Sequence, residues 1–149
     1  MLMFMGVYKI PKLIDINARS KLIRGFRKLL VIGRCVELEH PKFLELFKDY
    51  AKVSVCLEEE HMNMTGFKLA GVLARGNYEE VAVLTVDGSP HCTQLHYMVE
   101  EVCRLLGNPP RRRHYVIEGG KLIEVPEKAV KVSRYLSKVA KLLEERKIS

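Results

Sequence analysis

The sequence predicts an α/β protein whose sheet is mostly parallel. Short apolar runs alternate with stretches of helical periodicity, and these runs are apolar throughout rather than at every second residue. Strands of this kind are buried on both faces, as in parallel sheets that helices cover. With 149 residues, 48% hydrophobic and 29% charged, the chain is long enough to bury one core.

Residues 1–28 are predicted to form an N-terminal arm and a basic amphipathic helix, ARSKLIRGFRK (18–28). Residues 29–107 follow as three strand–helix units, because each apolar run precedes a stretch with helical spacing. Pro41 suits the first turn of the first helix, and Gly76 suits the end of the second. The expected strands are KLLVIGRC, KVSVCLE and EEVAVLTVDG, and the helices after them are HPKFLELFKDYA, NMTGFKLAGVLARG and CTQLHYMVEEVCRLLG.

Residues 112–149 have a different pattern. HYVIEGGKLIEV is typical of two strands joined by a tight Gly-Gly turn. PEKAVKVSRYLSKVAKLLEERK predicts one basic amphipathic helix whose apolar stripe packs back on the sheet. Without a repeat or a linker, residues 1–149 are expected to form a single domain. The whole pattern predicts a three-layer Rossmann-like or flavodoxin-like fold with a C-terminal β-hairpin and helix.

The charge balance favours an anionic partner. Lys and Arg number 25 against 18 Asp and Glu, a net charge of +7. Such an excess suits RNA, DNA or a phosphorylated small molecule, although a basic surface without that role explains it equally well. The chain has no apolar run long enough for a membrane span, and its apolar start lacks the features of a signal peptide. We therefore expect a cytoplasmic protein whose cysteines stay reduced.

Three of the four cysteines follow predicted strands. Cys35 ends the first apolar run, Cys56 ends the second, and Cys92 lies just beyond the third. Ligands of open parallel sheets bind outside the carboxyl ends of the strands, so these three thiols are expected to converge. Cys103 lies much farther along the third helix, beside apolar residues, and is expected to be a small core residue.

Three thiolates with one open coordination position suit a [4Fe–4S] cluster with one accessible iron, or a zinc ion. His91 and His96 are the candidate fourth ligands for zinc. Cys92 is expected near a helix N-terminus, where free N–H groups and the helix dipole stabilise a thiolate.

These residues resemble the thiouracil desulfidase family, small proteins that bind a [4Fe–4S] cluster through three cysteines. The matching segments are VIGRC, VSVCLEE and VDGSPHC. The resemblance implies that Cys35, Cys56 and Cys92 hold the cluster. It also implies that Glu58 and Ser89 take part in hydrolysis of a C–S bond. The chain departs from the family in its second and third motifs, where Leu57 and His91 replace a proline and a serine.

Four hypotheses follow. The first is an iron–sulfur desulfidase or sulfur-transfer protein that acts on a thiolated nucleobase or a similar small sulfur compound. The second is a non-catalytic iron–sulfur redox module, and the third is a zinc protein with three cysteine ligands and one histidine ligand. The fourth is a basic binding protein without metal, whose cysteines are buried. The other candidate partners are RNA, bound through the basic surface, and a second copy of the chain. No glycine-rich phosphate loop and no G-x-S-x-G motif is found in the sequence.

Overall fold

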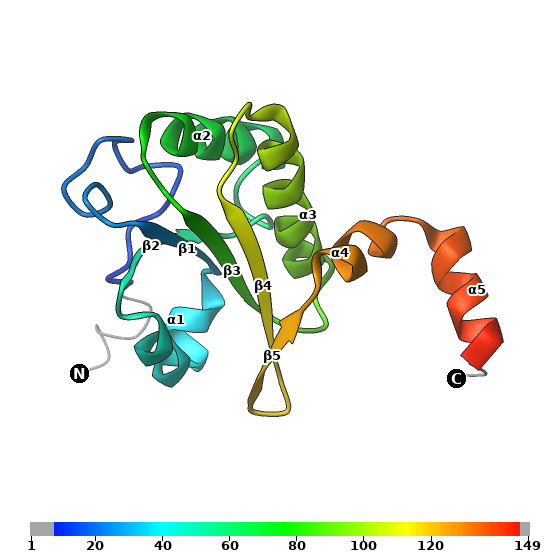
Figure 1. Cartoon of the computed structure of the whole chain (residues 1–149). Helices are drawn as coiled ribbons and strands as arrows, with labels where there is room; N and C mark the ends of the chain where they lie inside the picture. The colour runs from blue at the N-terminus through cyan, green and yellow to red at the C-terminus, as the bar shows by residue number, and fades with distance from the viewer. Residues whose placement is uncertain (1–7, 147–149) are drawn as a thin grey trace.

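The computed structural model describes residues 8–146 and centres on a five-stranded sheet with strand order β2-β1-β3-β4-β5 (Figure 1). The first four strands in this order are parallel, and β5 is antiparallel to β4. This arrangement confirms the predicted α/β fold with a mostly parallel sheet. The strands are β1 (Lys28–Gly33), β2 (Tyr50–Val55), β3 (Glu80–Val86), β4 (Arg111–Glu118) and β5 (Lys121–Val125).

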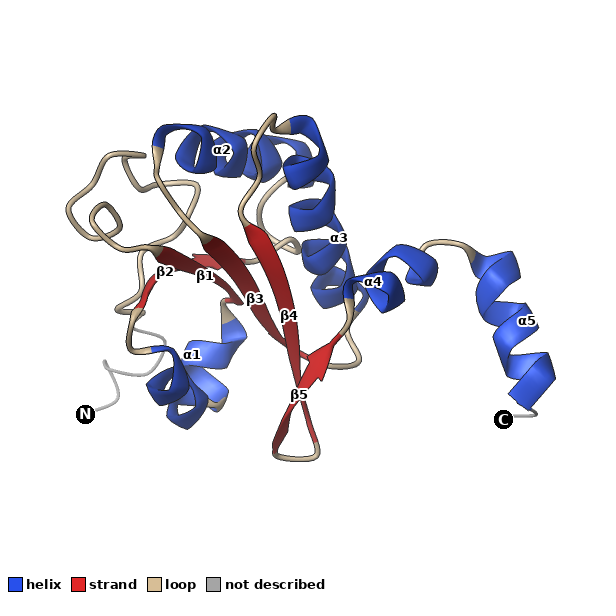
Figure 2. Ribbon diagram, in the orientation of Figure 1, coloured by secondary structure: helices blue, strands red, loops and turns tan. Residues whose placement is uncertain are grey.

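Helices cover both faces of the sheet (Figure 2). Two of them, α2 and α3, pack on one face, whereas α1 and a 3-10 helix, η2, pack on the other. No helix in the described part of the chain is long and apolar enough to cross a membrane. The helices are α1 (Cys35–Glu39), η2 (Pro41–Phe47), α2 (Met62–Arg75), α3 (Pro90–Leu105), α4 (Glu127–Ser133) and α5 (Leu136–Arg146).

Strand β1 shows why the apolar runs contain no polar alternation. Successive side chains of a strand point to opposite faces of the sheet. Leu29 and Val31 therefore join the core under α2 and α3, whereas Leu30 and Ile32 join the core under α1 and η2. Full burial of one such side chain stabilises the fold by about 1.5–3 kcal/mol. Residues 29–32 of this central strand face two cores in turn and are therefore all apolar.

The β4–β5 hairpin has the tight turn that the sequence predicts. Gly119 and Gly120 both adopt positive φ, +59° and +76°, and they directly join the two strands. Two consecutive residues with positive φ match the twist of a two-residue hairpin, and glycine adopts this conformation without strain.

Two of the predicted helices are wrong. Residues 18–28 form turns and then enter β1, because Asn17 and Ser20 accept hydrogen bonds from the nearby backbone N–H groups of Arg19 and Leu22. The predicted helix HPKFLELFKDYA is a 3-10 helix, and its last residues, Tyr50 and Ala51, belong to β2. Sequence analysis also missed the short helix α1.

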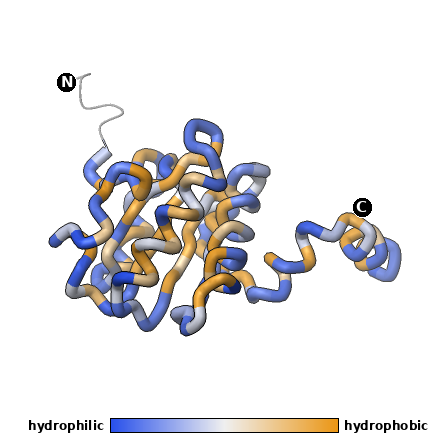
Figure 3. Tube along the Cα trace, turned by 90° about the horizontal axis from the view of Figure 1, so that it is seen from above, coloured by the Kyte–Doolittle hydropathy of each residue, from blue (hydrophilic) through white to orange (hydrophobic). Residues whose placement is uncertain are grey.

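The C-terminal region forms two helices rather than one. Ser133 Oγ donates to Val130 O at 2.6 Å, and the chain leaves the helix at Arg134. Val130 of α4 is buried, but no residue of α5 is buried. Helix α5 extends away from the sheet (Figure 3), so the prediction that its apolar stripe packs on the sheet was wrong.

Candidate metal centre

Cys35, Cys56 and Cys92 line a single cavity of about 250 Å³. The three strands that place them are neighbours, with Gly33 of β1 in register with Val55 of β2, and Ile32 with Leu84 of β3. The carboxyl ends of these strands meet at one edge of the sheet. A cysteine just after each strand therefore reaches the same cavity, although the three are far apart in sequence.

Cys35 lies close enough to Cys92 and Cys56 for both to influence its pKa. The pKa of Cys35 is raised, first by burial and then by the neighbouring Cys92, Glu39 and Cys56. All three cysteines are half-buried, so a ligand can reach them. Cys103 is buried elsewhere in the core, and burial raises the pKa of its thiol to about 11.

The Asp-Gly-Ser-Pro turn after β3 brings Cys92 into the cavity. Gly88 has a φ of +105°, which turns the chain away from the strand. Ser89 then caps α3, with its Oγ accepting a hydrogen bond from the backbone N–H of His91 at 3.2 Å. Pro90 occupies the first turn, where its missing N–H costs nothing. Cys92 thus lies in the first turn of α3, where the helix dipole favours an anion.

Three further residues of interest line the same cavity: Glu58, Ser89 and His91. Glu58 is exposed, whereas Ser89 and His91 are half-buried. Ser89 Oγ accepts the hydrogen bond from the His91 N–H through a lone pair, so its hydroxyl hydrogen remains available for donation. The cavity therefore presents soft sulfur ligands, one hydroxyl donor and two carboxylates, those of Glu39 and Glu58.

Sequence analysis missed a buried ion pair that shapes the wall of this cavity. Arg34 is 5% exposed and pairs with Glu60 at 2.5 Å and with Glu59 at 3.1 Å. Its Nε also donates to Ser54 Oγ at 3.3 Å. The other oxygen of Glu60 accepts a hydrogen bond from the backbone N–H of Cys56 at 3.1 Å. Arg34 and Glu60 thus hold the loop that carries Cys56. The only signal in the sequence is an arginine between a buried strand and a cysteine.

His96 does not join the cysteines. It is buried, with Nε2 hydrogen-bonded to Thr85 Oγ1 at 2.8 Å and Nδ1 to His114 Nδ1 at 2.9 Å. His114 Nε2 donates in turn to Glu100 Oε2 at 2.7 Å. Both ring nitrogens of His96 are therefore occupied, and of the two predicted accessory histidines only His91 faces the cavity.

Burial of His96 makes the stability of the protein sensitive to acid. Burial, with a contribution from His114, lowers the pKa of His96 to about 3. The unfolded chain binds a proton near pH 6.5 that the folded protein rejects, so stability falls as pH drops from 6.5 toward 3. We expect this residue to lower the free energy of unfolding by about 2 kcal/mol between about pH 8 and about pH 5.

Urea denaturation at both pH values measures this effect. In His96→Gln the pH-dependent loss should shrink by about 2 kcal/mol. An equal loss in the wild-type protein and in His96→Gln would contradict the assignment.

Within residues 8–146, no three His, Cys, Asp or Glu side chains are gathered closely enough to hold one metal ion. The fold defines an α/β protein whose cysteine cavity lies at the carboxyl ends of its parallel strands, the edge where open parallel sheets bind ligands. Residues 23–148 match the model of a family described as Rossmann-like domain, and the chain belongs to this family. No curated protein and no solved structure matches the chain.

Proposed function

We propose that the cysteine cavity holds a [4Fe–4S] cluster and that the protein is a desulfidase or sulfur-transfer protein for a thiolated nucleobase or a similar small molecule. One observation carries this proposal: Cys35, Cys56 and Cys92 line a single cavity together with Ser89 and Glu58. Thiolates favour iron–sulfur clusters, zinc and Cu(I) over hard cations. Three ligands leave one iron of a four-iron cluster open to a substrate.

The size of the cavity favours a cluster over a single ion. Its volume of about 250 Å³ is far more than the roughly 10–15 Å³ that a single water needs by the same measure. One ion would leave most of this space to solvent, whereas a cluster of four irons and four sulfides would occupy much more of it. The half-buried cysteines leave an approach from solvent for a small flat substrate.

When bound, the cluster would supply a Lewis-acidic iron that polarises the C=S bond of the substrate. The protein residues then position and activate water. Glu58 would accept a proton from the attacking water, and the free hydroxyl hydrogen of Ser89 would orient the water or the substrate. The carbon gains the oxygen of water and the sulfur leaves as sulfide, so the reaction needs no external oxidant or reductant.

His91 supports the second candidate, a zinc site with three cysteine ligands and one histidine, because it lines the same cavity as the three cysteines. Metal analysis of protein purified without oxygen separates the two candidates. About four irons and four acid-labile sulfides per chain would support the cluster, and about one zinc would support the zinc site. Release of sulfide from 2-thiouracil then tests the enzyme against a redox module, which should release none.

Loss of the Ser89 hydroxyl is expected to reduce turnover while leaving the cluster in place. In Ser89→Asn, sulfide release should fall by about 100-fold or more, the usual contribution of one hydrogen-bond donor positioned at the reacting group. Asparagine caps helices as well as serine does, so α3 should remain intact. Thr93→Ala removes an exposed hydroxyl from the same helical turn and serves as the matched control. Equal rates for the two variants would remove Ser89 from the mechanism.

A further inference from the structure

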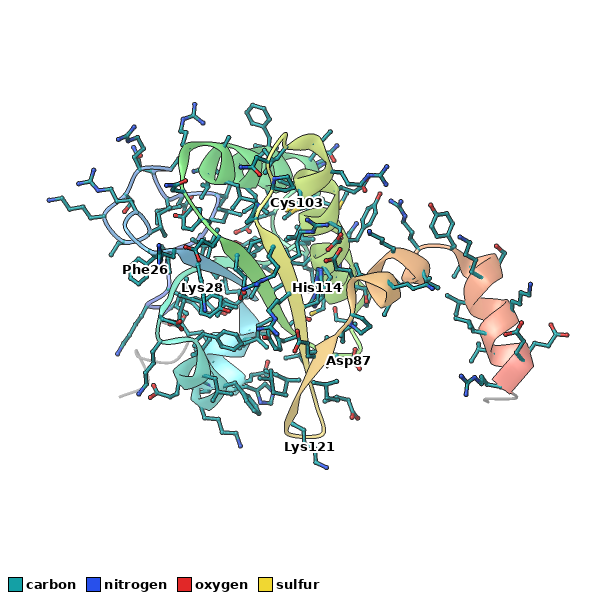
Figure 4. The ribbon with its side chains drawn as sticks, in the orientation of Figure 1. Phe26, Lys28, Asp87, Cys103, His114 and Lys121 are labelled. Carbon is teal, nitrogen blue, oxygen red and sulfur yellow. The ribbon has the colours of Figure 1, made fainter. Side chains whose placement is uncertain are left out.

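We propose that an arginine-lined pocket at the amino edge of the sheet binds the phosphate groups of a nucleotide or of a single-stranded nucleic acid. The pocket has a volume of about 460 Å³, and its lining includes four arginines, Arg19, Arg24, Arg27 and Arg75. It lies at the end of the sheet opposite the cysteines, as the positions of Phe26 and Asp87 show (Figure 4). The inference does not depend on the proposed function of the cysteine cavity.

Hydrogen bonds hold the segments that form this pocket. The loop before β1 is fixed by side chains that accept from its own backbone, with Asn17 Oδ1 bound to the N–H of Arg19 at 2.8 Å. Tyr78 OH donates to Ile23 O at 3.0 Å and ties this loop to the segment before β3. The backbone of Glu79 donates to Arg27 O at 2.7 Å. The arginines therefore extend from an ordered frame, which lowers the entropic cost of binding.

The pocket carries uncompensated positive charge. Its one carboxylate, that of Glu79, pairs with Arg27 at 3.0 Å. Within residues 8–146, Arg19, Arg24 and Arg75 have no carboxylate at ion-pair distance, and the remaining residues, 1–7 and 147–149, contain no Asp or Glu. Like charges around one cavity repel each other, and a bound anion would relieve this repulsion. The planar guanidinium group matches the oxygens of phosphate in a bidentate manner.

An aromatic ring in the same pocket favours a nucleotide unit over inorganic phosphate. Phe26 lines the pocket and is 39% exposed, so part of its ring is free. Bases stack on such rings with little dependence on sequence. The volume also lies within the range of about 300–1,000 Å³ that small-ligand pockets occupy. Phosphate contacts from the arginines and a base contact from Phe26 would together accommodate one nucleotide.

Binding of the full chain to a fluorescently labelled short single-stranded RNA tests the proposal by anisotropy. The logarithm of the binding constant falls linearly with the logarithm of the salt concentration, and each phosphate contact to a single strand adds about 0.7 to this slope. Three arginines without a carboxylate partner therefore predict about a 20-fold loss of affinity between about 50 and about 200 mM salt. Arg19→Gln/Arg24→Gln should weaken binding by about tenfold at the lower salt concentration and reduce the slope by about 1.4. Phe26→Leu should weaken it by about fivefold or more.

Lys121→Gln/Lys128→Gln removes the same charge from exposed positions outside the pocket and should change the affinity less than about twofold. Competition by AMP distinguishes the two sources of phosphate. If AMP displaces the RNA and its own binding requires Arg19 and Arg24, a free nucleotide is supported as the ligand. If AMP does not disturb RNA binding, a nucleic-acid strand is supported. Equal losses in the two double variants, or the absence of binding to both probes at low salt, would overturn the proposal.

Discussion

Replacing Cys35, Cys56 or Cys92 by alanine is expected to remove the proposed [4Fe–4S] cluster. In protein purified without oxygen, the content of about four irons and four sulfides per chain should fall to near zero in each variant, because each thiolate would hold one iron of the cluster. Cys103→Ala is the matched control, since Cys103 is buried in the core away from the cavity. Iron and acid-labile sulfide analysis, together with the visible absorption spectrum, measures the result.

The fold itself should survive these substitutions, because the three cysteines are half-buried and belong to no disulfide. Far-ultraviolet circular dichroism checks this directly. A folded variant that keeps its iron would contradict the three-cysteine site. One zinc per chain, lost in His91→Ala as well as in the cysteine variants, would replace the cluster with the zinc site of three cysteines and one histidine. Absence of both metals from the folded wild-type protein would leave the cysteines without a cofactor role.

The central sheet could be predicted from the sequence because a physical requirement leaves a visible pattern there. Residues 29–32 of strand β1 are buried on both faces and are all apolar, and helices α2 and α3 show their own periodicity. The expected meeting of Cys35, Cys56 and Cys92 followed from the same reasoning, because the ends of neighbouring parallel strands lie at one edge. The periodicity of apolar residues and the rule that parallel strand ends meet at one edge were sufficient to predict the sheet and the meeting of the cysteines.

The errors arose where an amphipathic pattern does not determine its own conformation. Residues 18–28 have helical spacing, yet local side-chain hydrogen bonds fold them into turns. Helix α5 has an apolar stripe, but nothing in its sequence shows whether that stripe is buried, and in the structure it is not. Periodicity predicts which residues share a face, and only the tertiary structure decides what covers that face.

The ion pair beside Cys56 could not be predicted for a related reason. Arg34 and Glu60 are 26 residues apart, and neither belongs to a periodic pattern. Glu60 stands in the run Glu58–Glu60, in which three identical residues have different environments: Glu58 and Glu59 are exposed, and Glu60 is largely buried. In the sequence the three glutamates look like one solvated acidic run. In the structure Glu60 accepts a hydrogen bond from the backbone N–H of Cys56.

Loss of the Arg34 side chain is expected to be the most destabilising change beside the cavity. Arg34→Met keeps much of the side-chain volume but leaves Glu60, with a side chain only 8% exposed, without its charge partner. Removing one member of a buried ion pair costs about 3–5 kcal/mol, because the remaining charge stays desolvated. Urea denaturation should show this loss as a lower midpoint with an unchanged slope.

Two further variants separate the buried charge from other effects of the substitution. Arg27→Met breaks the exposed pair with Glu79 and should cost less than about 1 kcal/mol. Glu60→Gln combined with Arg34→Met removes both buried charges and should recover much of the lost stability, which a double-mutant cycle measures. The single variant should also bind the proposed cluster less tightly, because Glu60 positions the backbone of Cys56. If Arg34→Met cost no more than Arg27→Met, the pair would be a surface contact, and the loop that carries Cys56 would need another support.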